Sequence, residues 1–154
     1  MFGYLKRSIG AMNLSTKEFE NKIDRIQSVD ELRKLLLQLP KTTFYDRLNE
    51  LLDKYGMSPS QIQKATGITK SLVYDITSER GKRKPQRYQI LKIALAMGLS
   101  VEETNELLKL ANYKELYAKN KVDAVIIFSI NQKLPEEEIE SLLIDAGATF
   151  SLFE

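Results

Sequence analysis

Apolar residues recur at intervals of three and four along most of the chain, and helix-capping residues stand between the apolar segments. This spacing is typical of amphipathic helices, because side chains three and four positions apart lie on one face. Ser15 and Glu18 match a capping box, in which each side chain accepts a hydrogen bond from the other residue's backbone. A helix is therefore predicted directly after Ser15, with Phe19, Ile23 and Ile26 on one face.

A second capping box follows at Ser28 and Glu31 and opens another predicted helix. Pro40 is expected to end this helix, because the residue before a proline is disfavoured in the α conformation. Four leucines recur at helical spacing and are expected to face inward: Leu32, Leu35, Leu36 and Leu39.

Five further helices are predicted between residues 43 and 111. A cap residue or a capping box precedes most of them, and a glycine ends three of them because glycine adopts the left-handed conformation without steric cost. The predicted helices span residues 44–55, 59–66, 70–78, 86–97 and 101–111. Residues 81–85 (GKRKP) are predicted to form a basic loop.

The last third of the chain repeats the preceding pattern. Residues 134–146 align with residues 99–111 at an offset of 35, with leucines, glutamates and a final alanine in the same register. The short apolar segment 124–130 (AVIIFSI) is compatible with a β-strand by its β-branched residues. The repeat instead favours a buried helix there, as the first helix of a second helical hairpin.

These patterns predict an all-α protein with three regions. Residues 1–42 form an N-terminal helical extension, residues 43–98 the central domain, and residues 99–154 a region of helical hairpins.

Composition excludes several classes of chemistry. The 154 residues contain no histidine and no cysteine, which removes imidazole catalysis, thiol nucleophiles, disulfides and the common zinc sites. We therefore expect no enzyme, no metal and no cofactor. No apolar run reaches the roughly 18 residues of a membrane span, and residues 1–14 do not follow the pattern of a signal peptide, so a cytoplasmic protein without membrane contact is expected.

The net charge of +2 hides a strong segregation along the chain. Residues 69–92 carry seven basic and two acidic residues, a net of +5, whereas residues 99–154 carry five basic and eleven acidic residues, a net of −6. This distribution favours a polyanion partner for the basic segment and a different partner for the acidic one. Solvated helix faces of opposite sign are the alternative explanation.

The segment from residue 55 to residue 85 carries the most specific motif. Gly67 suits a turn that needs a positive φ, Thr69 suits a helix N-cap, and apolar residues at fixed spacing suit the contact between two short helices: Ile62, Ile68, Val73 and Ile76. This segment resembles the helix-turn-helix of the lambda repressor-like (Xre/Cro) DNA-binding family, over about residues 44–111.

The resemblance implies that residues 70–78 form a recognition helix in the DNA major groove, and that the protein is a transcriptional regulator. Lys70, Ser71 and Tyr74 match the family's base-contacting positions. The residues expected at phosphates are Gln61, Thr69, Lys82, Arg83, Lys84 and Arg87. A homodimer on double-stranded DNA is expected, with the C-terminal region available for association, a signal or a protein partner.

Two residues favour a different function. Asp75 puts a carboxylate on the expected DNA-facing surface, where it repels phosphate although it can accept from a cytosine amino group. Gln63 stands where the family usually has a small alanine. The alternative is therefore a protein-interaction adaptor that keeps the helix-turn-helix as a scaffold, with Tyr74 covering the core rim and residues 82–84 forming a solvated loop.

Overall fold

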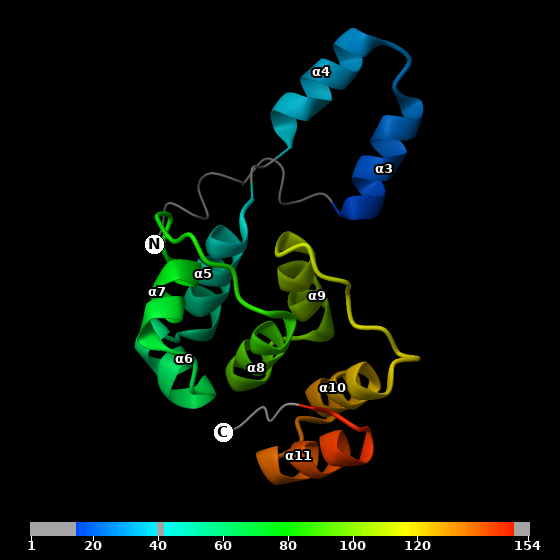
Figure 1. Ribbon diagram of the computed structural model, residues 1–154. Coiled ribbons are helices and arrows are strands. Elements are labelled where there is room, and N and C mark those ends of the chain that lie inside the picture. The colour runs from blue at the N-terminus through cyan, green and yellow to red at the C-terminus, as the bar shows by residue number, and fades with distance from the viewer. Residues whose placement is uncertain (1–14, 40–41, 150–154) are drawn as a thin grey trace. The chain divides into compact units, whose positions relative to one another are not determined.

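The computed structural model describes residues 15–39 and 42–149, and these residues contain α-helices and no β-strand (Figure 1). The all-α prediction is therefore confirmed for this part of the chain. The chain divides into two compact units, residues 1–42 and residues 43–154.

The N-terminal unit contains α3 (Thr16–Arg25) and α4 (Val29–Gln38). Ser15 and Glu18 form the predicted capping box. The second predicted box is only half formed: the Ser28 hydroxyl accepts from the backbone N–H of Glu31, but the Glu31 carboxylate accepts from the backbone N–H of Gln27 in place of Ser28. Of the four leucines predicted to face inward, only Leu35 is buried, and the other three are exposed. Helix α3 has no buried residue. Two short helices enclose too little volume to bury a full apolar stripe. Pro40 lies outside the described residues.

The second unit contains the remaining helices of the described chain, with boundaries close to those predicted. They are α5 (Phe44–Tyr55), α6 (Pro59–Thr66), α7 (Lys70–Thr77), α8 (Arg87–Met97), α9 (Val101–Leu110), α10 (Lys121–Gln132) and α11 (Glu136–Asp145). The segment 124–130 lies within α10, so the prediction of a helix in place of a strand is confirmed. The prediction that this helix is buried holds only in part, because Ile126 and Ser129 are buried while Phe128 is exposed.

Helix α8 forms the centre of this unit, between α6 and α9 (Figure 1). Its apolar residues do not form a single stripe, and a helix that is apolar all round is expected to be buried. Five of its apolar side chains are buried: Ile90, Leu91, Ile93, Ala94 and Met97. Helix α8 is therefore a buried helix against which α6 and α9 pack.

Helices α10 and α11 pack against each other, and α10 also contacts α9. Ile126 on α10 and Leu143 on α11 are almost completely buried and join the same hydrophobic core as α8. Residues 43–98 and residues 99–149 thus share one core. No helix in the described ranges is long and apolar enough to cross a membrane.

Candidate nucleic-acid interface

Helices α6 and α7 meet at a short turn around Gly67. Gly67 has φ 72°, the left-handed conformation, and ends α6. Thr69 caps α7, because its hydroxyl accepts a hydrogen bond from the backbone N–H of Leu72 at 3.3 Å. The four apolar residues predicted to lock the two helices are all buried: Ile62, Ile68, Val73 and Ile76.

The opposite face of α7 is open to solvent. Lys70, Ser71 and Tyr74 are all exposed, and Tyr74 keeps 60% of its surface accessible. The ammonium group of Lys70 forms no hydrogen bond or ion pair with any residue that the structure describes. The three residues predicted to contact bases therefore share an accessible surface.

The C-terminus of α7 is fixed to α5 by a buried amide. The Asn49 side chain donates to the carbonyl oxygen of Thr77 at 3.0 Å and to that of Tyr45 at 2.8 Å. A carbonyl at a helix C-terminus lacks a partner within the helix, so Asn49 supplies one. No local sequence pattern predicts this contact, because 28 residues separate Asn49 from Thr77.

The basic loop folds back along α7 through a close backbone approach. A Cβ atom at Gly81 would lie 1.7 Å from the carbonyl oxygen of Asp75, so only glycine fits there. Two residues later, Arg83 Nε donates to Asp75 Oδ2 at 2.6 Å, and Arg83 Nη2 donates to the Ser71 hydroxyl. Asp75 is therefore paired and lies beside Arg83 on the α7 surface.

Lys82 and Lys84 differ in their surroundings. Lys82 is exposed, and no described residue forms an ion pair or hydrogen bond with its side chain. Lys84 Nζ donates to the carbonyl oxygen of Ala111 at 2.8 Å and lies 4.4 Å from the ring centroid of Tyr113. Lys84 thus ties the loop to the end of α9, whereas Lys82 is available to an outside partner.

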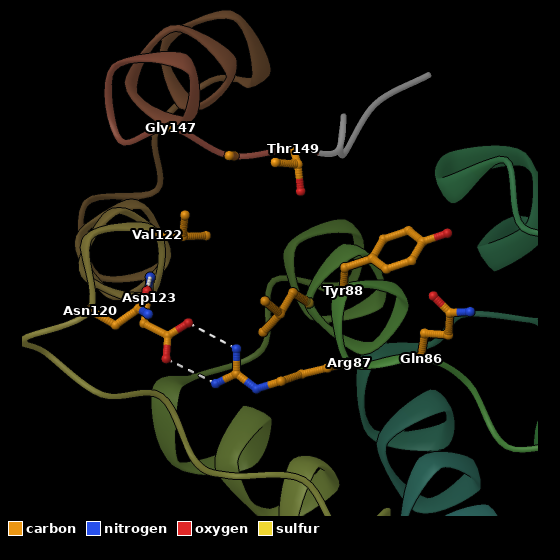
Figure 2. A pocket seen from close by; sticks show the side chains of 10 residues that line it. Gln86, Arg87, Tyr88, Asn120, Val122, Asp123, Gly147 and Thr149 are labelled. Carbon is orange, nitrogen blue, oxygen red and sulfur yellow. Dashed lines mark hydrogen bonds and ion pairs between the residues drawn. The ribbon is translucent and has the colours of Figure 1, made fainter.

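Arg87 has a full set of internal partners. Its Nη1 and Nη2 each donate to a carboxylate oxygen of Asp123 at 2.9 Å, as Figure 2 shows. Nε and Nη2 also donate to the carbonyl oxygens of Lys114 and Glu115. The pair borders a cavity of about 400 Å³ between α8 and the C-terminal hairpin. These contacts give Arg87 a role in packing that the sequence did not indicate.

Gln61 and Thr69 serve as helix caps. The Gln61 side chain accepts from the backbone N–H of Ser58 at 2.8 Å, and Thr69 caps α7 as described above. Both residues are exposed. They lie at the N-termini of α6 and α7, where free backbone N–H groups favour anions.

A polar cluster joins α5 to α9 on the other side of the unit. The buried carboxylate of Glu103 accepts hydrogen bonds from Lys54 Nζ at 2.6 Å and from the Tyr55 hydroxyl at 2.5 Å, and it also accepts from the backbone N–H of Ser100. Burial alone raises the pKa of this carboxyl, but these donors outweigh burial and lower the pKa to about 2. Glu103 thus remains ionised and holds α9 against α5.

Comparisons with protein-family models, with curated proteins and with solved structures find no significant match to this chain.

Proposed function

We propose that this chain is a sequence-specific DNA-binding transcriptional regulator that inserts α7 into the major groove of double-stranded DNA. The observation that carries the proposal is the surface at the start of α7, where Lys70, Ser71 and Tyr74 are exposed next to the basic loop. Donors and acceptors on one face of a short helix suit the edges of base pairs in the major groove.

The charges around the exposed face of α7 support the same proposal. Lys70 and Lys82 are exposed cations, and the N-termini of α6 and α7 add partial positive charge near Gln61 and Thr69. Contacts of this kind set the position of a protein on the phosphate backbone without reading sequence. The base-reading face and the phosphate-facing groups are thus adjacent.

The proposed regulator binds DNA as a homodimer. A single helix of eight residues reaches too few base pairs for high specificity, and two-fold pairing on half-sites about one helical turn apart is the usual solution. The C-terminal hairpin presents Phe128 and Ile144 to solvent, at 53% and 73% exposure. Each of these exposed apolar side chains is available for association.

A protein-interaction adaptor is the second candidate, and one observation favours it. Three of the cations in the basic segment have internal partners: Arg83 with Asp75, Lys84 with Ala111, and Arg87 with Asp123. Fewer cations therefore remain for phosphates than the sequence suggests.

Selection from a random pool of duplex DNA, followed by a gel shift at two salt concentrations, distinguishes the two functions. A DNA-binding regulator enriches a defined sequence and binds it more weakly as salt rises. An adaptor enriches no sequence, and the retained DNA binds with the same weak affinity as the starting pool.

A further inference from the structure

The Arg83 guanidinium lies on the outward face of α7, although Arg83 belongs to the loop that follows the helix. Ser71 and Asp75 are four positions apart and share this face. Arg83 bonds to both of them, with Nε on Asp75 Oδ2 at 2.6 Å and Nη2 on the Ser71 hydroxyl. The close approach of Gly81 to the Asp75 backbone brings the loop near enough for this contact.

The two bonds use only one edge of the guanidinium. Nε and one N–H of Nη2 form the side edge of the planar group, and this edge faces the helix. The end edge consists of Nη1 and the second N–H of Nη2, and no described residue accepts from Nη1. The Arg83 side chain is 52% exposed, so an outside acceptor can approach it.

We propose that Arg83 is a base-reading residue whose end edge donates to O6 and N7 of a guanine in the major groove. Asp75 and Ser71 act as positioning residues that fix the plane of the guanidinium. This inference rests on the proposed function and adds to it that each half-site contains a G·C pair facing the loop end of α7. Arginine is well suited to a guanine because its fork of donors matches the two acceptors.

The pairing with Asp75 favours a base over a phosphate as the partner of Arg83. A phosphate contact depends mainly on net positive charge, and the Asp75 carboxylate cancels that charge locally. The directional donors remain, already held in one orientation, so less side-chain entropy is lost when a base is bound. The same pair explains how a carboxylate is tolerated on a surface that faces DNA, because Asp75 is not left unpaired.

The test replaces each guanine of the selected DNA sequence in turn with 7-deazaguanine, which lacks the N7 acceptor. Wild-type protein should lose about 5- to 150-fold in affinity at one guanine per half-site. Arg83→Ala removes all of these donors, and should bind normal and substituted DNA equally at that position. Asp75→Asn should weaken the same preference while leaving affinity for random duplex equal or higher, an effect that a merely structural residue would not produce.

Lys82→Ala is the matched control from the same loop. It should lower affinity for every duplex and keep the full 7-deazaguanine profile. A melting curve for each variant shows whether the fold is retained, and Arg83→Gln provides a second variant that lacks the fork.

Three results would overturn the inference. If Arg83→Ala keeps the wild-type profile, Arg83 does not contact the guanine N7 while the proposed function stands. If Asp75→Asn leaves the preference intact, Asp75 does not position Arg83. If wild-type protein enriches no DNA sequence, the proposed function fails and the inference fails with it.

Discussion

Arg87 on α8 and Asp123 on α10 form a two-bond ion pair that joins the central helix to the C-terminal hairpin, with both N–O distances at 2.9 Å (Figure 2). The Asp123 side chain is only 6% exposed, and the same carboxylate also accepts from the backbone N–H of Tyr117. The basic segment of the sequence thus supplies one of its cations to internal packing.

Breaking this pair should destabilise the fold. Arg87→Ala leaves a buried carboxylate without its main partner, and the expected loss is about 3 kcal/mol in the free energy of unfolding. Asp123→Asn should lose a smaller amount because the amide still accepts one hydrogen bond. Urea denaturation of both single variants and the double variant measures the coupling; additive losses would mean that the two side chains do not interact in solution.

The Glu103 cluster predicts a specific dependence of stability on pH. The folded pKa of Glu103 is lowered to about 2 from an ordinary value of 4.5. A carboxyl with a lowered folded pKa stabilises the fold above its unfolded pKa, and this contribution is lost as pH falls from about 4.5 to about 2. Wild-type protein should therefore exceed Glu103→Gln in stability at pH 7, and the difference should shrink over that interval.

Urea denaturation between pH 2 and pH 7 tests this, with Glu102→Gln as the matched control. Glu102 is exposed and lies one residue earlier in α9. A difference between wild type and Glu103→Gln that stays constant with pH would show that the carboxyl has the same pKa in both states.

Burial in the C-terminal hairpin gives a third prediction, which compares two residues of α10. Ile126 is fully buried, so Ile126→Ala should reduce stability by about 2 to 5 kcal/mol. Phe128 is 53% exposed, and Phe128→Ala should change stability by about 0.5 kcal/mol or less. Equal losses at both positions would mean that Phe128 is covered in solution, and sedimentation equilibrium would then test for a dimer through this face.

Local sequence signals predicted the helices of the described residues, because helix caps and apolar spacing act within a few residues. Ser58 and Gln61 form the capping box that opens α6, and Gly67 ends that helix in the left-handed conformation. The 35-residue repeat placed α10 correctly where strand propensity alone was ambiguous. The helical register also predicted that Lys70, Ser71 and Tyr74 point outward.

The sequence could not indicate which charged residues pair with one another. Arg83 meets Asp75 eight residues away, but Arg87 meets Asp123 across 36 residues, and charge counting treats both arginines alike. The Asn49 contact with Thr77 is another long-range hydrogen bond with no local pattern. Such partners depend on how the helices pack, which periodicity does not specify.

Gly81 gives the fourth prediction, since its missing Cβ is essential to the loop. Gly81→Ala would place a Cβ 1.7 Å from the Asp75 carbonyl oxygen, so the loop must shift and stability should fall by about 1 to 3 kcal/mol. Gly56 is the matched control, because it has φ 64° and open space around its Cβ position. Asn tolerates the left-handed conformation, so the melting temperature of Gly56→Asn should be close to that of the wild type. The melting temperature of Gly81→Asn should be lower, because its Cβ meets the Asp75 backbone.

The salt dependence of DNA binding gives the last prediction, because it separates free cations from cations with internal partners. Each phosphate contact adds about 0.9 to the slope of log affinity against log salt. Lys82 is unpaired among the described residues, so Lys82→Ala should flatten the slope by about 2 for a dimer. Arg87 is bound to Asp123 and two carbonyls, so Arg87→Lys should leave the slope unchanged while reducing stability. The opposite result is a flatter slope for the Arg87 variant and an unchanged slope for Lys82→Ala. It would mean that DNA displaces Asp123 from Arg87 and that the α8–α10 contact opens on binding.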